Sequence, residues 1–289
     1  MTQSPISACV TDDPAALEEA IRANVRAAIE EDIGSGDISA ALIAQETGAR
    51  ATIITREAGV FCGRAWGDEV CRQVDRSIEV AWQVDDGDRV GREQVLVVLE
   101  GPARSLLSAE RTLLNFLQFL SGTATATATM VNRIADTNTR LLDTRKTVPG
   151  LRIAQKYAVL CGGGHNHRIG LYDAYLIKEN HIAAAGSISA AVHRARQLNP
   201  GKPVEVEVEN RRELAEAITA GADIAMLDNF SLEETSLAVN QAQGVIALEA
   251  SGGIDENSVT EIATTGVNYV SIGNLTKCVQ PMDLSMRLD

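Results

Sequence analysis

Beyond residue 139 the chain repeats one pattern, an apolar run that ends in polar residues, and this repeat constrains the fold more than any other feature. The runs are LLDTRK (141–146), AYLIKEN (174–180), VEVEVEN (204–210), IAMLDN (224–229), ALEASGG (247–253) and YVSIGN (269–274). The last four begin about 20 to 25 residues apart, and segments with helical periodicity, such as 211–219, 232–240 and 256–263, fill the gaps. This is the strand–helix alternation of a parallel sheet.

Polar residues at the carboxyl end of every run indicate a β/α barrel, because the active sites of such barrels gather on that face. A complete barrel has eight strand–helix repeats. Six clear runs therefore predict an incomplete, open parallel barrel, which we place at residues 113–277.

Residues 1–112 are expected to form a smaller α/β domain with an antiparallel sheet. Asp12, Asp13 and Pro14 are typical of a helix start. Segments 49–61 and 78–84 alternate like strands and flank a helical segment at 67–76. The acidic stretch 85–88 could suggest a sugar-phosphate loop, but another strand follows it, so we expect a tight turn between antiparallel strands.

The link between the domains is predicted to be a buried, leucine-rich helix that starts at residue 103 and reaches residue 120. The Thr/Ala run at 123–130 fits either a strand or a packed helix, and residues 278–289 are expected to return to the first domain. The stretch EEDIGSGDIS (30–39) contains two glycines, but it follows a helix, whereas a phosphate-binding glycine loop joins a strand to a helix. We therefore interpret it as structural, with phosphate binding as the alternative.

The charge and cysteine content exclude several classes of protein. A formal net charge of −13 argues against nucleic acid or an anionic membrane as a partner. Five cysteines without a CxxC pair favour a reducing compartment over a disulfide framework or a structural zinc site. Neither a secretory leader nor a run of membrane-spanning length is visible, so we expect a cytoplasmic protein.

The VEVEVEN run predicts carboxylates at the barrel mouth. Strand periodicity sends its valines to the outer helices and Glu205, Glu207 and Glu209 to the opposite face. Clustered like charges are unfavourable unless cations lie among them. By the same strand alternation, Lys146 and Lys178 lie on faces from which they could neutralise the glutamates. Salt bridges with a purely structural role would explain the same pattern.

The same mouth is expected to bind a phosphorylated, multiply charged anion. Glycines end the last two runs, at 251–253 and 273–274, where late barrel loops commonly bind phosphate through backbone N–H groups, although simple turns use glycine as well. Residues 141–181 gather lysines, arginines and histidines in a chain that is otherwise acidic. Arginine matches carboxylates bidentately, so this cluster indicates a small polycarboxylate. We expect the phosphate site on one side, the cations on the other and carboxylates between them.

The motifs DTRKT-PGLR, CGGG-NHR, LIKENHI, VEVEVEN, MLDNF, EASGGI and SIGNLTK occur in this order between residues 143 and 277. In this combination the chain resembles the quinolinate phosphoribosyltransferase family, and EEDIGSGDIS fits as well. The resemblance implies phosphoribosyl transfer from phosphoribosyl pyrophosphate to quinolinate with loss of carbon dioxide, in NAD biosynthesis. It also implies Mg²⁺ as cofactor and a homodimer or higher oligomer with shared active sites.

The resemblance assigns roles to individual residues. The quinolinate pocket would be formed by Arg111 of a neighbouring subunit, Thr144, Arg145, Lys146, His167, Arg168 and Lys178. Glu207 and Asp228 would hold the ribose hydroxyls and the Mg²⁺ shell, and these two with Lys146 and Lys178 are the expected catalytic residues. The 5′-phosphate would lie on Ser251, Gly252, Gly253, Ile272, Gly273 and Asn274. Lys277 stands where many members have histidine.

Three other functions fit parts of the pattern. A related phosphoribosyltransferase could act on another carboxylated heterocycle. A Schiff-base aldolase would use Lys178 or Lys146 as its nucleophile. A sugar-phosphate binding protein would keep the phosphate loops but would not need so many converging charges.

Overall fold

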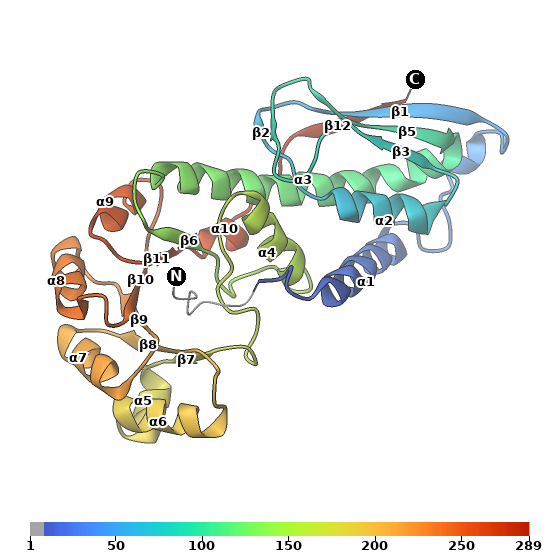
Figure 1. The fold of residues 1–289 in the computed structure, drawn as a ribbon. Helices are drawn as coiled ribbons and strands as arrows, with labels where there is room; N and C mark the ends of the chain where they lie inside the picture. The colour runs from blue at the N-terminus through green and yellow to red at the C-terminus, as the bar shows by residue number, and fades with distance from the viewer. Residues whose placement is uncertain (1–8, 289) are drawn as a thin grey trace. The chain divides into compact units, whose positions relative to one another are not determined.

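The repeated runs form one six-stranded parallel sheet with the strand order β6-β11-β10-β9-β8-β7 (Figure 1). Its strands are β6 (Arg140–Leu142), β7 (Tyr175–Ile177), β8 (Val204–Val208), β9 (Ile224–Asp228), β10 (Ala247–Ser251) and β11 (Tyr269–Ser271). Every neighbouring pair is parallel. In the computed structural model, which describes residues 9–288, β6 and β7 are the two edge strands of this sheet. The prediction of an open parallel barrel is confirmed.

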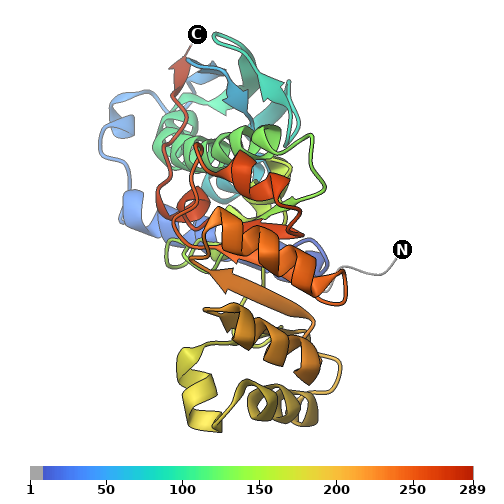
Figure 2. The same ribbon diagram turned by 90° about the vertical axis from the view of Figure 1, so that its left-hand side faces the viewer.

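Helices cover the outer face of this sheet (Figures 1 and 2). They are α5 (Glu179–Ala185), α6 (Ile188–Leu198), α7 (Arg211–Ala220), α8 (Leu232–Ala242) and α9 (Val259–Thr264). Polar residues just after the strands cap the N-termini of α7 and α8. The Asn210 side chain accepts the Glu213 N–H in α7, and the Ser231 side chain accepts the Glu234 N–H in α8. The valines of β8 are fully buried, and β8 contacts α6 and α7. Strand periodicity therefore predicted the faces of β8 correctly.

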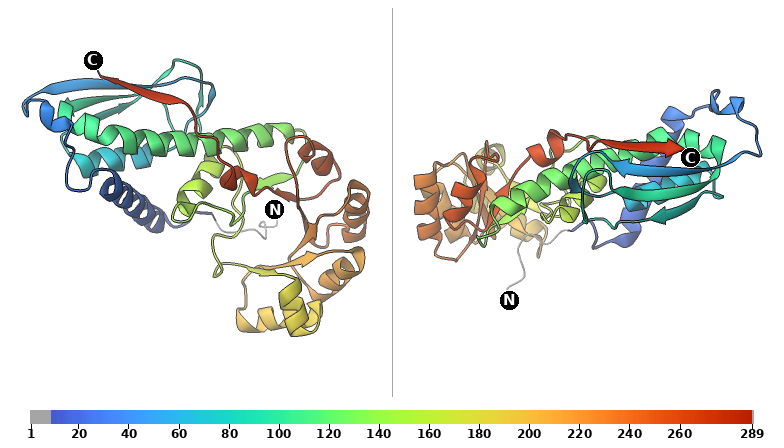
Figure 3. Two further views of the ribbon diagram at one scale, coloured as in Figure 1. Left: turned by 180° about the vertical axis from the view of Figure 1, so that it is seen from behind. Right: turned by 90° about the horizontal axis from the view of Figure 1, so that it is seen from above.

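A second, antiparallel sheet has the order β12-β1-β5-β3 and lies over α3 (Figure 3). Its strands are β1 (Gly48–Thr55), β3 (Glu79–Trp82), β5 (Val95–Pro102) and β12 (Leu284–Leu288). Helices α1 (Pro14–Asp32), α2 (Arg64–Val74) and α3 (Ala103–Arg133) accompany this sheet. Asp13 caps α1 by accepting the Ala16 N–H, as the Asp-Pro pair predicts. The core includes Trp66, Phe61 and many aliphatic side chains.

The chain divides into two units that differ from the predicted domains. The N-terminal unit comprises Val10–Ala128, Thr147–Gly163 and the segment from Leu275 onward, and the barrel unit comprises Thr129–Lys146 and Gly164–Asn274. The predicted boundary after residue 112 falls inside α3, whose helix continues through the Thr/Ala run. The segment with α4 (Arg152–Cys161) also groups with the N-terminal unit. β12 pairs with β1, so the C-terminal segment belongs to the antiparallel sheet.

The acidic turn at 85–88 lies between antiparallel strands, as predicted, because β3 before it pairs antiparallel with β5 after it. Between the turn and β5 the chain also forms the short strand β4 (Arg89–Val90), which pairs with β2 (Gly59–Val60) in a separate sheet. The turn itself is tight, with the Asp88 N–H donating to the Asp85 carbonyl oxygen at 3.1 Å. One of its acids caps a helix, because Asp86 Oδ1 accepts the backbone N–H groups of Gly63 and Arg64 at the start of α2. Periodicity cannot show this, because the capped amides lie more than twenty residues away in sequence.

The loop at 30–39 is held by its own acid. Asp37 accepts the N–H groups of Ser39 and Ala40 at 2.9 Å, and the Ser108 hydroxyl at 2.9 Å. These contacts agree with the structural interpretation of the loop. Within residues 9–288, no helix has both the length and the apolar character needed to cross a membrane.

Candidate active site at the barrel mouth

The carboxyl ends of β7 and β8 bring a lysine to a carboxylate. Leu176 pairs with Glu205, so two residues further along each strand Lys178 comes beside Glu207. Lys178 Nζ donates to Glu207 Oε2 in a short ion pair. The prediction that a strand-end lysine neutralises a glutamate of VEVEVEN is confirmed for this pair. Glu209, beyond the end of the strand, is exposed.

The two strand-end lysines, Lys146 and Lys178, do not lie next to each other in the sheet. They follow β6 and β7, the opposite edges of the sheet. Lys146 lies instead beside the end of β11: a Cβ atom added at Gly273 would come within 2.8 Å of Lys146 Cδ and 3.5 Å of Thr144 Oγ1. Glycine at 273 thus leaves space for the polar residues that follow β6.

Two arginines at the mouth have no anionic partner within the described chain. Arg145 Nε is buried and receives no hydrogen-bond partner in residues 9–288. Arg168 donates to the Ala174 carbonyl oxygen at 3.3 Å. Burial, and then the nearby Arg145 guanidinium, lower the pKa of Arg168 below its usual value. Two neighbouring guanidinium groups, one with a buried and unsatisfied N–H, are suited to an anion.

Beneath them, the barrel interior contains His167 between two glutamates. His167 Nε2 lies 2.9 Å from Glu205 Oε2 and 3.4 Å from Glu249 Oε2. All three side chains are less than a tenth exposed, and within the described residues Glu205 Oε1 and both Glu249 carboxylate oxygens lack hydrogen-bond partners. Burial and then the charge of Glu249 raise the pKa of Glu205 to about 7. This cluster therefore retains a proton that an exposed carboxylate would lose.

The hydrogen bonds decide where that proton lies. Burial lowers the pKa of His167, and the carboxylates of Glu249 and Glu205 more than offset this and raise it to about 10, which describes an imidazolium. However, Nδ1 accepts the Arg168 backbone N–H at 2.7 Å, and a nitrogen that accepts cannot carry a proton. We therefore assign the neutral Nε2–H tautomer to the ring and the extra proton to the glutamate pair.

Asp143 fixes the backbone beside this ring, and the sequence analysis did not single it out. Its buried carboxylate accepts Asn166 Nδ2–H at 2.7 Å and the His167 backbone N–H at 2.8 Å. Glu249 was missed as well. Glu249 offered a signal, since it is a charged residue inside an otherwise apolar run, whereas Asp143 stands at the polar end of its run like the residues that follow it. Only the structure shows that both lie beside His167.

The ends of β9 and β10 form a close pair of turns. The Asn229 N–H donates to the Ser251 carbonyl at 3.0 Å. Gly252 has a φ of 103°, and a Cβ atom there would lie 2.2 Å from Asn229 Oδ1, so only glycine fits. Asp228 is half-buried at the end of β9, and its carboxylate forms no hydrogen bond or ion pair within residues 9–288. The register places Asp228 next to Ser251.

The remaining candidates follow from the same strand ends and from α3. Ile272 is buried and donates its N–H to the Leu142 carbonyl oxygen at 3.0 Å. Gly253 is exposed beyond the end of β10, and Asn274 is exposed at the start of α10 (Asn274–Lys277).

Arg111 is exposed on α3 in the N-terminal unit. Within the described chain it forms no ion pair with Glu110 or any other carboxylate, so the simple alternative of a surface salt bridge is not observed.

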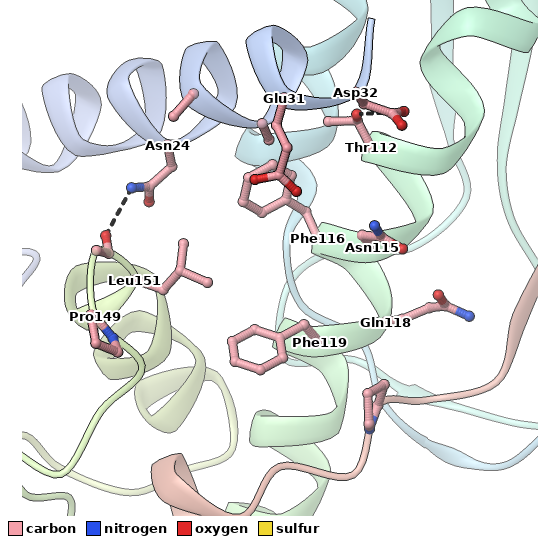
Figure 4. Close-up of a pocket in the computed structure, with 14 residues that line it drawn as sticks. Asn24, Glu31, Asp32, Thr112, Asn115, Phe116, Gln118, Phe119, Pro149 and Leu151 are labelled. Atoms are coloured by element: carbon pink, nitrogen blue, oxygen red, sulfur yellow. Dashed lines mark hydrogen bonds between the residues drawn. The ribbon is translucent and has the colours of Figure 1, made fainter.

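The N-terminal unit has a hollow of its own, with a volume of about 570 Å³. Figure 4 shows Phe116, Phe119 and Leu151 pointing into it, with Glu31 at its side. Its lining contains acids, amides and apolar groups, and none of the residues predicted for the site. The chemistry predicted from the sequence lies at the barrel mouth instead.

Two family models together match most of the chain. The model described as quinolinate phosphoribosyl transferase, N-terminal domain, matches residues 37–121, and its C-terminal domain counterpart matches residues 123–287. The chain is 44% identical over 257 residues to a probable nicotinate-nucleotide pyrophosphorylase [carboxylating] of Bacillus subtilis, covering 89% of both chains. It is 39% identical over 279 residues to the nicotinate-nucleotide pyrophosphorylase [carboxylating] of Mycobacterium leprae, covering 93% of this chain and 98% of the relative.

A solved structure agrees with these sequence matches. The nicotinate-nucleotide pyrophosphorylase from Francisella tularensis superposes with a TM-score of 0.91 and is 50% identical, covering 94% of this chain and 97% of that one. The similarity therefore extends over the antiparallel sheet as well as the open barrel.

Proposed function

The chain belongs to the quinolinate phosphoribosyltransferase family, and from that membership we propose how its barrel mouth performs the family's reaction. It is a transferase of NAD biosynthesis, a nicotinate-nucleotide pyrophosphorylase of the carboxylating type. Quinolinate receives the phosphoribosyl group of phosphoribosyl pyrophosphate, and pyrophosphate and carbon dioxide are released. The observation that carries the assignment of the site is the buried Arg145 Nε, which has no hydrogen-bond partner within residues 9–288 although a second guanidinium, that of Arg168, lies near it.

Arg145 and Arg168 are proposed to bind the two carboxylates of quinolinate, with Thr144 and Lys146 along the pocket wall. Arg145 Nε is buried without a partner, and a carboxylate would remove that deficit. His167 acts from below: both ring nitrogens face groups of the chain, one the Arg168 backbone and one the glutamates. We therefore propose that His167 positions Arg168, which refines the expectation that it contacts the substrate directly.

Glu207 and Asp228 are proposed to hold the ribose hydroxyls and the shell of a Mg²⁺ ion. The donor set fits, since Mg²⁺ prefers carboxylate and water oxygens and Asp228 has no competing cation among the described residues. When bound, Mg²⁺ supplies positive charge to the departing pyrophosphate. Lys178, already paired with Glu207, would lie between a substrate carboxylate and the ribosyl carbon.

The loops after β10 and β11 are proposed to bind the 5′-phosphate. Their residues are Ser251, Gly252, Gly253, Ile272, Gly273 and Asn274. Glycine lets the backbone approach the phosphate oxygens, and backbone N–H groups of such loops can donate to them. The sheet order puts these two loops between the residues that follow β6 and the carboxylates of β9 and β8.

In the proposed mechanism the residues contribute mainly positions and charges. Carboxylates near the anomeric carbon stabilise the positive charge that develops as pyrophosphate leaves. The pyridine nitrogen attacks that carbon and becomes cationic. The pyridinium then accepts the electron pair of the neighbouring C–COO⁻ bond, so carbon dioxide can leave without a further cofactor. The arginines hold the ring in the orientation that both steps need.

The active assembly is proposed to be a homodimer in which Arg111 completes the partner's quinolinate pocket. Arg111 is exposed and lacks an ion pair in the described chain, so its charge is available to an external anion. A two-fold interface would complete both sites together.

The alternatives have weaker support. A Schiff-base aldolase needs a free lysine amine, whereas Lys178 Nζ donates to Glu207. A related enzyme for another carboxylated heterocycle would need a different arrangement of cations from the family pattern that this chain retains.

Calorimetric titration of quinolinate into Arg145→Ala tests the pocket. We expect the dissociation constant for quinolinate to rise roughly tenfold to a hundredfold, because that change corresponds to the binding free energy of a hydrogen bond between charged groups. Arg140→Ala is the matched control, because Arg140 begins the strand that Arg145 follows. Equal affinities of Arg145→Ala and the unmodified protein would remove Arg145 from the pocket.

A further inference from the structure

Three side chains of the N-terminal unit bring metal-binding atoms together. Cys62 lies between β2 and α2, Asp86 lies in the turn after β3, and Cys161 is the last residue of α4. The two sulfur atoms and a carboxylate oxygen all lie within 4.8 Å of one another. The three residues come from segments far apart in sequence, so the fold itself assembles the group. None of them has a role in the proposed reaction.

The positions of these residues are well fixed. Cys62 is fully buried; its N–H donates to Ser121 Oγ at 3.0 Å and its carbonyl accepts the Ser121 hydroxyl at 3.1 Å. The helix that ends in Cys161 is anchored by the Tyr157 ring, whose centroid lies 5.5 Å from that of Trp66. A site whose backbone is already fixed loses little conformational entropy when it binds an ion.

Asp86 is held in a way that leaves it available to a cation. Oδ1 caps α2, and Oδ2 accepts the Tyr157 hydroxyl at 2.8 Å. A hydrogen bond of this kind from a neighbouring group orients a metal-binding carboxylate. The arginine next to the turn, Arg64, pairs with Asp85 instead. Within residues 9–288 no lysine or arginine forms an ion pair with Asp86, so no basic side chain occupies the cluster.

We propose that Cys62, Cys161 and Asp86 bind one thiophilic divalent cation of the zinc type. Two sulfur ligands and one oxygen ligand suit Zn²⁺ or Cd²⁺, and they exclude Mg²⁺, which takes oxygen ligands. Zinc–sulfur bonds of about 2.3 Å and zinc–oxygen bonds of about 2.0–2.2 Å place tetrahedral ligand atoms less than about 4 Å apart, so small side-chain movements suffice. Binding releases the two thiol protons to solvent, and no electron is transferred.

The outer two ligands give the ion a route from solvent. Cys161 and Asp86 are half-buried, whereas Cys62 closes the inner side. Water can then take the fourth position. The ion would join the end of α4 to the β2–α2 loop and the turn after β3. Because the unfolded chain does not hold these atoms together, binding stabilises the folded N-terminal unit.

Cadmium titration of the reduced, full-length protein after dialysis against a chelator tests the site, because Cd²⁺–thiolate bonds absorb in the ultraviolet. We expect one tightly bound ion per chain, and a rise in the thermal unfolding midpoint on binding. Cys161→Ser should lose at least half of the absorption, and its unfolding midpoint should no longer respond to cadmium. Asp86→Asn, which can still cap α2, should bind about tenfold or more weakly.

Two matched variants make the test specific. Cys278→Ser removes an exposed thiol outside the cluster, and Asp85→Asn removes the neighbouring acid of the same turn. Both should bind cadmium like the unmodified protein. The proposal is overturned if the unmodified protein binds no ion, or if Cys278→Ser loses the signal and Cys161→Ser keeps it. Neither outcome depends on enzymatic activity, so the test is independent of the proposed function.

Discussion

At the scale of single residues, the barrel interior shows how burial changes the chemistry of a side chain. Glu205 and Glu207 belong to the same strand face, yet Glu207 pairs with Lys178 whereas Glu205 faces His167 and Glu249. Alternation in the sequence predicted that carboxylates would face inward. It could not separate the glutamate that binds a lysine from the one that keeps a proton, because that difference depends on depth in the barrel.

The proton on Glu205 predicts a pH dependence of stability. Its folded pKa of about 7 lies above the ordinary value of 4.5, so between these values the folded state binds more protons than the unfolded state. Stability from this group is therefore complete below pH 4.5 and is lost as the pH rises through about 7. The loss should be roughly 3 kcal/mol, since a difference of one pKa unit is worth about 1.4 kcal/mol.

Urea unfolding of the protein without substrates, between pH 5 and pH 8, measures this effect. The Glu205→Gln variant, which cannot ionise, should lose less stability than the unmodified protein as the pH rises. Parallel curves for the two proteins would show that Glu205 does not hold the proton.

The two strand-end lysines make a second prediction. Lys146→Ala and Lys178→Ala should each lower turnover roughly a hundredfold or more, because each removes a positive charge placed at the reacting groups. Circular dichroism should show an unchanged fold, since both side chains are exposed. His165→Ala is the control, with a milder loss expected. A near-normal rate for either lysine variant with both substrates saturating would contradict the assigned mouth.

At the scale of elements, local patterns predicted the structure well where one strand or helix determines its own environment. The six barrel strands and α7 to α9 follow from periodicity, and α7 and α8 also follow from the caps beside them. The pairing of β4 with β2 and the division inside α3 were not predicted, because both depend on contacts between segments distant in sequence. The edge positions of β6 and β7 were not predicted for the same reason: strand order is a property of the whole sheet.

Gly252→Ala tests the loop after β10. Gly252 has a φ of 103°, and a Cβ atom added there would clash with Asn229 Oδ1. Alanine should therefore displace this loop. We expect the KM for phosphoribosyl pyrophosphate to rise about tenfold or more, since charged hydrogen bonds to the phosphate would be lost. Gly244→Ala, with a φ of 73° and no atom within 4 Å of the added Cβ, carries a similar backbone strain elsewhere and should keep its KM. Equal KM values for the two variants would remove the loop from the phosphate site.

At the scale of the whole molecule, the proposed homodimer predicts complementation between two inactive variants. Arg111 belongs to the N-terminal unit and Lys146 to the barrel unit. If Arg111 serves the partner's site, a mixed dimer of Arg111→Ala and Lys146→Ala has one site with both changes and one with neither. Activity should then return after subunit exchange. Mixed dimers that form, as shown by differently tagged subunits, but stay inactive would place Arg111 in the site of its own chain.

The central claim is the decarboxylating transfer to quinolinate, and one assay with two substrates tests it most directly. The protein is given carboxyl-labelled quinolinate, phosphoribosyl pyrophosphate and Mg²⁺. Labelled carbon dioxide and pyrophosphate should then be released in equal amounts. Nicotinate lacks the carboxylate that is lost, which would leave cationic groups of the pocket unpaired, so pyrophosphate release with it should be slower by roughly 10⁴-fold. Efficient pyrophosphate release with nicotinate, or none with quinolinate, would contradict the account.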